Sequence, residues 1–255
     1  RALALTDADG TTMADALAAA GRDPLALGSD PDLVARIGAF VELHVEQGRA
    51  LDDVHANVGV GSHIWPHGRW RIDVPGEANH AGTTALDDRR DAMLGFAAAV
   101  IAARRAAQSR GCVATVGKVR ATPNGVNAIP SEVTGWLDAR GESEAAVHQV
   151  VADVTEVMAD FEATVQEESW TPTTAFDDAL VRRVASRLGG IPVLGTGAGH
   201  DAGILAGAGV RAAMLFVRNP TGISHSPEEF AEEADCLAGV DALTRVLADL
   251  TGATP

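Results

Sequence analysis

Three observations predict that the chain has an α/β fold with an inserted α+β domain. Residues 63–171 follow the order strand–helix–strand–strand–helix–strand, which is that of the split βαβ, or ferredoxin-like, unit. Residues 210–217 form a continuous apolar run, typical of a strand buried on both faces. Residues 40–48 alternate apolar and polar side chains, as a half-buried strand does. We therefore expect residues 1–62 and 172–255 to form the α/β domain around the insert.

Composition limits the classes of partner. The chain has 255 residues, 46% hydrophobic and 22% charged, as expected for a globular protein. Its formal net charge of −15 disfavours nucleic acid and anionic membranes, because both attract basic surfaces. Cys112 and Cys236 lie far apart in the sequence, which argues against a disulfide scaffold and indicates a reducing compartment such as the cytoplasm. The sequence has no apolar run of about 18 residues, so we expect no membrane span.

Before the first strand, local signals predict short helices. Thr11 or Thr12 is a candidate N-cap for an Ala-rich helix that ends at Gly21. Residues 31–38 read as a helical turn that leads into the strand. Residues 50–61 are expected to continue extended and to end in a glycine-rich bend.

The periodicity of apolar residues predicts two helices in the insert. In the first helix Met93, Phe96, Ala97, Val100 and Ile101 are expected to share the buried face. The second helix begins after Ser143, a favourable N-cap residue. Its expected buried residues are Val147, Val150, Val151, Val154, Met158 and Phe161. The predicted elements are strand 64–74, loop 75–84, helix 88–105, strand 112–119, turn 122–130, strand 133–139, the second helix and strand 163–170.

The last segment returns to the α/β pattern. Its final helix, ending near residue 250, has two candidate starts. Ser226 and Glu229 have capping-box spacing, with Pro227 at the first helical position. Alternatively, Asp235 caps the helix. The preceding elements are helix 174–188, strand 191–194, a Gly-rich turn at 195–201, helix 200–208, the strand at 210–217 and a loop at 219–226.

Five polar residues stand at the ends of predicted elements, where functional groups are often placed. Two of them, His44 and His225, could share a metal ion with carboxylates, because Zn²⁺ and related ions accept imidazole and carboxylate ligands. The others are His80, Asn127 and Arg140. HExxH, CxxC and GxSxG are absent, which excludes zincins and serine hydrolases of those types. The sequence GTGAGHD lacks the Lys-Ser/Thr of a P-loop.

Five motifs in order carry a family resemblance. They are ELHVEQG at 42–48, GEANHAGTT at 76–84 with DRRDA at 88–92, PNGVNAIP at 123–130 with LDAR at 137–140, GAGHDA at 197–202 and GISHSPEE at 222–229. Together the motifs resemble the M20-type metal-dependent amidohydrolases. That family includes N-carbamoyl-L-amino-acid hydrolases, allantoate amidohydrolases and β-ureidopropionases.

The resemblance implies a metallopeptidase-like catalytic domain, partial in this sequence, that uses two divalent ions such as Zn, Mn, Co or Ni. His44 matches a ligand of one ion and His225 a ligand of the other. The implied reaction is hydrolysis of a linear amide or ureido C–N bond by metal-activated water, with release of ammonia and carbon dioxide. The implied substrate is a small anionic carbamoyl or ureido acid.

The resemblance also assigns residues to substrate and to assembly. Gln47 matches a side chain that contacts substrate, and His80 matches a histidine that stabilises the oxyanion. Asn127 and Arg140 match residues that bind the substrate carboxylate or ureido group, and a guanidinium fork suits a carboxylate. The inserted domain is implied to act as a lid and to form a homodimer, with residues that can reach the neighbour's site.

The sequence departs from the family pattern upstream of His44. The family's other metal ligands, a histidine, a bridging aspartate and a glutamate, are not found there, and neither is the glutamate that acts as general base. The first residue is Arg rather than Met, so we expect an upstream segment to be absent and this chain alone to bind metal poorly and to turn over nothing. Glu42 and Glu46 are weaker candidates for the base.

Three alternatives stay open. The protein could be an M20 peptidase or an N-acyl-amino-acid deacylase, or a non-catalytic dimerisation or ligand-binding fragment. The motifs HVEQG and NHAGTT favour the carbamoyl branch. His200 and Asp201 are expected only to support the neighbouring loop.

Overall fold

The computed structural model describes residues 2–7 and 9–253, and the chain divides into two compact units, Arg1–Gly38 and Ala39–Pro255. In the first unit the predicted cap is confirmed. The Thr12 hydroxyl accepts from the Asp15 backbone N–H at 3.0 Å, and the Asp15 carboxylate accepts from the Thr12 N–H, so the two form a capping box. The helices of this unit are η1 (Ala2–Ala4), α1 (Met13–Ala19), η2 (Pro24–Ala26) and α2 (Pro31–Ala35).

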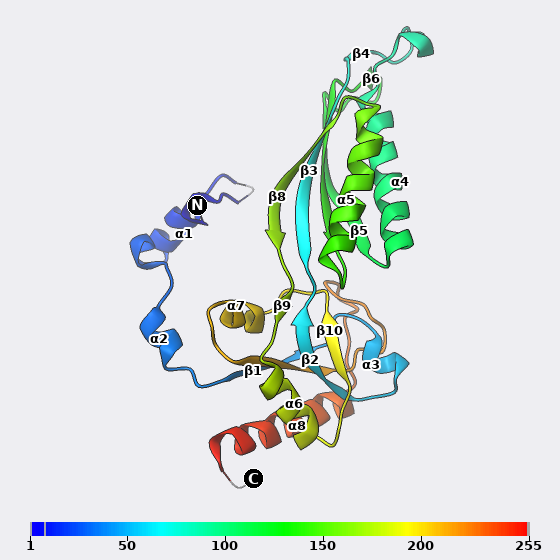
Figure 1. Cartoon of the computed structure of the whole chain (residues 1–255). Helices are drawn as coiled ribbons and strands as arrows, with labels where there is room; N and C mark the ends of the chain where they lie inside the picture. The colour runs from blue at the N-terminus through cyan, green and yellow to red at the C-terminus, as the bar shows by residue number, and fades with distance from the viewer. Residues whose placement is uncertain (1, 8, 254–255) are drawn as a thin grey trace. The chain divides into compact units, whose positions relative to one another are not determined.

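The second unit contains a five-stranded sheet of order β1-β11-β2-β10, with β9 beside β2 (Figure 1). Strand β1 runs parallel to β11, and β11 runs antiparallel to β2. The mixed α/β character expected from residues 40–48 and 210–217 is therefore confirmed. The strands are β1 (Phe40–Val45), β2 (Val58–Ile64), β9 (Thr174–Ala175), β10 (Val193–Thr196) and β11 (Ala212–Val217).

The expectation that residues 50–61 are extended throughout is wrong, because helix α3 (Ala50–Asp53) precedes β2. Glu46 provides the reason. Its carboxylate accepts from the backbone N–H groups of Ala50 at 2.7 Å and Leu51 at 3.0 Å, and these donors open the helical turn. Glu46 is buried, and both of its oxygens are engaged in this way. The residue therefore holds the turn after β1, which argues against its use as a general base.

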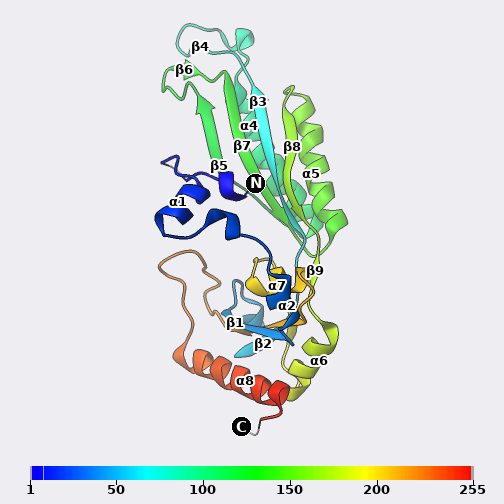
Figure 2. The same cartoon turned by 90° about the vertical axis from the view of Figure 1, so that its left-hand side faces the viewer.

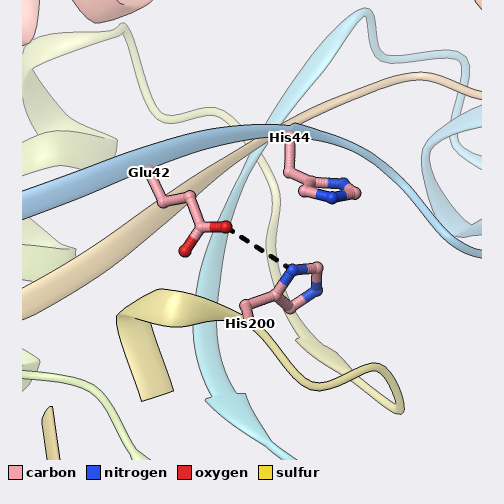
Figure 3. A group of neighbouring side chains, drawn as sticks. All are labelled: Glu42, His44 and His200. Atoms are coloured by element: carbon pink, nitrogen blue, oxygen red, sulfur yellow. Dashed lines mark ion pairs between the residues drawn. The ribbon is translucent and has the colours of Figure 1, made fainter. Parts of the chain in front are cut away.

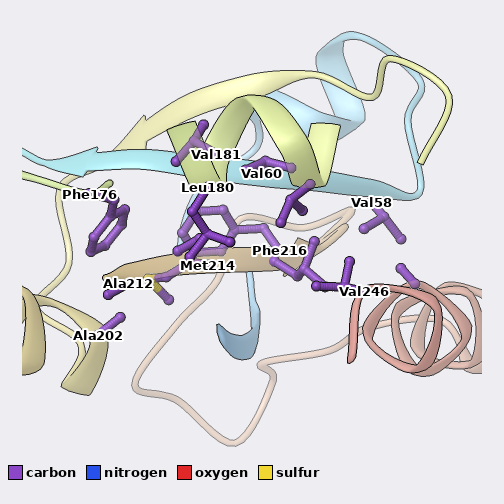
Figure 4. Close-up of a cluster of buried hydrophobic side chains, with 14 of the residues drawn as sticks. Val58, Val60, Phe176, Leu180, Val181, Ala202, Ala212, Met214, Phe216 and Val246 are labelled. Carbon is purple, nitrogen blue, oxygen red and sulfur yellow. The ribbon is translucent and has the colours of Figure 1, made fainter. Parts of the chain in front are cut away.

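The core of this sheet forms around β11, whose six residues are all buried (Figure 4). Side chains from three helices pack on it. Leu180 and Val184 come from α6, Ala202 from α7 and Val246 from α8. Burial on both faces explains why the sequence of this strand has no polar alternation. The helices are α6 (Asp178–Arg187), α7 (Asp201–Gly207) and α8 (Glu233–Thr251).

A four-stranded antiparallel sheet of order β5-β7-β3-β8 occupies much of the predicted insert, with α4 and α5 on one face (Figures 1 and 2). The compact unit Ala39–Pro255 contains both this sheet and the five-stranded sheet, so the domain boundaries at 63 and 171 remain predictions. The elements are β3 (His67–Pro75), β4 (Asn79–His80), η3 (Leu86–Asp88), α4 (Ala92–Arg110), β5 (Val113–Thr122), β6 (Ala128–Ile129), β7 (Glu132–Arg140), α5 (Glu144–Ala159) and β8 (Thr164–Thr171).

The two helices of this sheet differ in how well their buried faces follow from sequence. Ser143 caps α5 as predicted, and its residues Val147, Val150, Val154 and Met158 are fully buried. In α4 the prediction is mostly wrong. Phe96 is buried as expected, whereas Met93, Val100 and Ile101 are exposed and the buried face consists mainly of small residues. These residues are Ala92, Gly95, Ala99, Ala103, Ala106 and Ala107.

Small residues allow α4 to approach its neighbours closely. A Cβ added at Gly95 would lie 2.8 Å from Val74 Cγ1 and 2.9 Å from Phe161. Close approach favours Gly and Ala at the contact. Because these residues contribute little hydrophobicity, the apolar pattern of the sequence does not mark this buried face.

No helix in the described part of the chain is both long enough and apolar enough to cross a membrane.

Neither predicted start of the last helix is correct. Helix α8 begins at Glu233 after Glu232, which makes no side-chain cap bond. Asp235 is instead fully buried and accepts from Arg218 Nε at 2.9 Å, from Arg218 Nη2 at 3.2 Å and from the Asn57 amide. The aspartate therefore ties α8 to the segments that flank β2 and β11.

Replacing Asp235 with Ala is expected to lower the free energy of unfolding by about 3 kcal/mol, because it leaves the Arg218 charge and the Asn57 amide without their buried acceptor. Urea denaturation measures the change. The matched control is Asp241→Ala on the same helix, whose carboxylate is exposed and 3.7 Å from Arg245; it should cost less than about 1 kcal/mol. Equal losses in the two variants would show that the buried network does not stabilise the helix.

Candidate active site

Strand β1 presents two polar side chains to the start of α7. Glu42 and His44 alternate along the strand, and His200 precedes α7 (Figure 3). One possible ligand atom from each of the three residues lies within 4.8 Å of the other two. Within residues 2–7 and 9–253, no other group of three His, Cys, Asp or Glu side chains meets that spacing. His44, which the sequence predicts to bind metal, thus lies in a cluster of possible ligands with Glu42 and His200.

The local contacts orient this cluster. Glu42 accepts from the Ala202 N–H at 2.7 Å with one carboxylate oxygen, and its other oxygen lies 3.8 Å from His200 Nδ1. The His44 Nδ1 lies 2.7 Å from the Val45 carbonyl oxygen, so the N–H belongs on Nδ1 and the Nε2 lone pair remains available. The rings of His44 and His200 meet edge to face, with 4.7 Å between their centroids.

His200 combines burial with an unpartnered nitrogen. Its side chain is 2% exposed, and its buried Nε2 has no hydrogen-bond partner. Burial, followed by the nearby His44 ring, lowers the pKa of His200 to about 4, against the opposing effect of Asp201. The imidazole is therefore neutral near pH 7. Two imidazoles and a carboxylate, one imidazole with an unpaired buried nitrogen, fit the coordination preferences of a divalent ion such as Zn²⁺.

This lowered pKa predicts acid sensitivity of the metal-free protein. The unfolded chain binds a proton at His200 below about pH 6.5, whereas the folded chain does so only near pH 4, so stability falls as the pH drops through that window. Between about pH 7.5 and about pH 5 the loss from this residue should be about 2 kcal/mol. Urea unfolding with a chelator present measures it, and His200→Gln, which keeps Glu42, His44 and Asp201, should remove that part of the pH dependence. An unchanged pH dependence in the variant contradicts the assignment.

A cavity of about 470 Å³ brings together three of the predicted site residues, Gln47, Arg140 and His225. The Gln47 amide donates to Ser224 Oγ at 2.8 Å and lies 3.4 Å from His225 Nε2. Phe216 also lines the cavity, and its ring centroid is 5.8 Å from that of His200. The donor cluster and the cavity are therefore neighbours at the end of β11.

Arg140, at the end of β7, extends its guanidinium to this cavity. Nε and Nη2 donate to the Asp138 carboxylate at 2.8 and 2.6 Å, and Nη1 donates to the Gly197 carbonyl at 2.6 Å. Three of the five guanidinium N–H groups are thus engaged, which fixes the orientation of the fork. The remaining donors are available to an anion in the cavity.

His225 lines the cavity but is absent from the donor cluster. Its backbone adopts a left-handed conformation with φ of 58°, and its N–H donates to Glu229 at 2.9 Å. No metal-type group of three in the described residues includes it. Shared metal binding by His44 and His225 therefore remains a prediction.

His80 and Asn127 lie together at the other end of the four-stranded sheet. Strand β4 pairs with β6 through His80 and Ala128, and the Ala81 N–H donates to the Asn127 carbonyl at 2.9 Å. His80 follows β3 and Asn127 precedes β7, so both lie beyond the end of the sheet at which Pro75 pairs with Glu132. Arg140 pairs with His67 at the opposite end. Along β7 this separation is roughly 25 Å. The structure therefore does not bring these two residues to the cavity of their own chain.

The sequence model of peptidase family M20/M25/M40 matches residues 14–249. The chain belongs to this family. The family resemblance drawn from the five motifs is thereby confirmed.

Several M20-family relatives resemble the chain over most of its length. It is 34% identical to an N-carbamoyl-L-amino acid amidohydrolase of Geobacillus stearothermophilus, covering 95% of this chain and 62% of that protein. It is 31% identical to the allantoate amidohydrolase of Escherichia coli, covering 96% and 62%. The chain thus spans about three fifths of the length of the curated relatives it matches.

Solved M20-family structures have the same fold. AtUAH in complex with (S)-hydroxyglycine superposes with a TM-score of 0.84 at 26% identity, covering 98% of this chain and 64% of that one. A hydantoinase/carbamoylase family amidase from Burkholderia vietnamiensis gives a TM-score of 0.85 at 30% identity, covering 97% and 62%. The chain therefore shares the fold of these structures over nearly all of its length.

Sequence reasoning expected His200 only to support the neighbouring loop, and it did not group His200 with Glu42 and His44. The signal for Glu42 was its alternation with His44 along one strand face. The signal for His200 was its position in a Gly-rich turn directly before a helix, where a side chain is held close to the sheet edge. Only the fold shows that a segment about 150 residues downstream returns to β1.

Proposed function

We propose that the protein hydrolyses a linear amide or ureido C–N bond in small N-carbamoyl or ureido acids, with help from divalent metal. One water and one carbamoyl group yield an amine, carbon dioxide and ammonia. The observation that carries this proposal is the metal-type cluster of Glu42, His44 and His200 beside a cavity that holds Arg140 and Gln47. The relatives named above, which act on carbamoyl amino acids and allantoate, support the substrate class.

The donor cluster would hold an ion through one ring nitrogen of each imidazole and through a carboxylate oxygen. When bound there, Zn, Mn, Co or Ni supplies a water of lowered pKa, about 7 for Zn²⁺ in known sites, and Lewis acidity toward a carbonyl. We propose two ions, the second of which would require His225 together with ligands outside the donor cluster.

The chain's own residues bind and orient the substrate. Arg140 receives the carboxylate through the guanidinium donors that Asp138 and Gly197 leave unused. We assign the Gln47 amide, which donates to Ser224 Oγ, to contact with the ureido group. Trp65, Leu194 and Phe216 provide apolar lining that limits the water around the bound molecule. An acidic protein can therefore accept an anion at one local basic group.

We also propose that the inserted domain forms a homodimer and that His80 and Asn127 serve the neighbouring subunit's site, His80 as the oxyanion donor. Their position at the far end of the four-stranded sheet from Arg140 supports this assignment. A mixture of His44→Ala and His80→Ala proteins, each inactive alone, should regain activity after subunit exchange. Continued inactivity of exchanged heterodimers would argue against a shared site.

A substrate panel tests the proposed function. The full-length gene product, loaded with metal, is assayed with N-carbamoyl-L-amino acids, allantoate, N-acetyl-L-amino acids and dipeptides. We expect ammonia from the first two classes at rates at least about tenfold above amine release from the others, a preference of about 1.4 kcal/mol. Faster hydrolysis of acyl or peptide substrates would assign the protein to the deacylase or peptidase branch.

A further inference from the structure

The loop between β11 and α8 carries His225 and Ser224, yet it has no regular secondary structure. Such a loop holds its side chains in place only if its backbone groups have partners of their own. The first residue of the loop motif, Asn219, is fully buried, unlike most asparagines. A buried amide is retained at low cost only when its hydrogen-bonding capacity is used.

Both halves of the Asn219 amide are used. The oxygen Oδ1 accepts from the Thr221 N–H at 3.1 Å, the Thr221 hydroxyl at 2.9 Å and the Gly222 N–H at 3.0 Å. The nitrogen Nδ2 donates to the carbonyl oxygens of Ile223 at 2.9 Å and Glu46 at 3.2 Å. These partners also fix the orientation of the amide, because backbone N–H groups need an oxygen and carbonyls need a donor.

The two halves serve different purposes. The oxygen side builds the local turn at residues 221–222, where Gly222 has a φ of 68° and a Cβ would lie 2.5 Å from Arg49 Cγ. The nitrogen side joins the loop to the end of β1, at the residue that precedes Gln47. Asn219 thus connects the two segments that place Gln47 and His225 in the cavity.

Further contacts close this connection into a ring. Gln47 donates to Ser224 Oγ at 2.8 Å, and Ser224 Oγ lies 3.2 Å from Glu229 Oε2. Glu229 also accepts from the His225 N–H. Displacing the loop from β1 would therefore break the bond from Gln47 to Ser224 and move Ser224 and His225 away from Gln47.

We propose that Asn219 is a positioning residue, which holds the His225 loop on β1 and thereby aligns His225 and Gln47. Its effect on catalysis rests on the proposed function, whereas its effect on the two side chains does not. Asn219→Asp separates the two roles of the amide. The carboxylate keeps acceptors for Thr221 and Gly222, but it offers no N–H to the carbonyls of Glu46 and Ile223.

The test compares Asn219→Asp with Thr134→Val in the full-length gene product. Thr134 is also buried and donates to Asp73 Oδ1 at 2.9 Å, but it lies in the four-stranded sheet away from the cavity. Two readouts are measured on each protein: the NMR resonances of the Gln47 side-chain amide and the His225 ring, and kcat/KM. In Asn219→Asp both sets of resonances should shift, and kcat/KM should fall about 10- to 100-fold. Thr134→Val should leave the resonances unchanged and kcat/KM within about twofold.

The outcomes separate this proposal from the proposed function. A folded Asn219→Asp protein with wild-type resonances for Gln47 and His225 overturns the positioning role. Shifted resonances in a protein whose wild type hydrolyses no panel substrate uphold the positioning role and reject the proposed function. If Asn219→Asp does not fold, Asn219→Ala decides by the same readouts, because it also removes the donors to Glu46 and Ile223 but buries no charge. Unchanged resonances in that variant would then count against the proposal.

Discussion

Replacing His44 with Ala is expected to lower the affinity for divalent metal by at least about 100-fold and to reduce turnover below detection. The residue supplies one of the two imidazoles of the donor cluster, together with Glu42 and His200. Loss of a residue that only supports a metal ligand typically costs 10- to 100-fold, so loss of a ligand should cost at least the upper end of that range. In the proposed mechanism bound metal supplies the activated water, so turnover should fall together with metal content.

Metal content by mass spectrometry and ammonia release, measured on the same samples, check this expectation. The matched control is His148→Ala, which removes an exposed histidine that stacks on Trp170 in the four-stranded sheet. The control should retain wild-type metal content. Full metal occupancy in His44→Ala at limiting metal concentration would show that the ion is held elsewhere.

The second large effect is expected at Arg140. Arg140→Ala should lower kcat/KM for carboxylate-bearing substrates by about 30- to 1000-fold, which corresponds to about 2–4 kcal/mol for a lost, partly buried charge contact. Most of the change should appear in KM, because the carboxylate is bound equally in the ground and transition states. Arg140→Lys should recover little, since an ammonium cannot reproduce the fork held by Asp138 and Gly197.

A control arginine and a control substrate sharpen this test. Arg69 lies 3.5 Å from the same Asp138 carboxylate but is largely exposed and does not line the cavity, so Arg69→Ala should change kcat/KM less than about fivefold. For a neutral carboxamide analogue of the substrate, Arg140→Ala should have little effect. An equal loss for the carboxylate and the carboxamide would mean that Arg140 does not bind the substrate anion.

The features that sequence reasoning obtained correctly are those with strong local signals. Alternation placed His44 on a polar strand face, and large β-branched residues marked the buried face of α5. The buried face of α4 was not predicted, because Gly95 and the alanines around it pack by close approach rather than through large apolar side chains. The prediction that Asp235 caps α8 was wrong, because its carboxylate instead accepts a hydrogen bond from Arg218, which lies outside the helix.

In the candidate site, too, residues with local sequence signals were predicted, whereas those that depend on contacts distant in the sequence were not. Motifs identified Gln47, Arg140 and His225, and the fold collects all three in one cavity. His200 was undervalued, because its contact with Glu42 and His44 depends on the return of the chain to β1 and on burial. Burial also sets its pKa, and no local pattern in the sequence reports burial at a glycine-rich turn.

The most direct test of the account is ammonia release from N-carbamoyl-L-amino acids and allantoate by the full-length gene product, before and after removal of metal. We expect release by the metal-loaded protein, its loss on chelation and its recovery when Zn²⁺, Mn²⁺, Co²⁺ or Ni²⁺ is restored. Release that persists after complete metal removal, or its absence from both substrate classes with metal bound, would contradict the account.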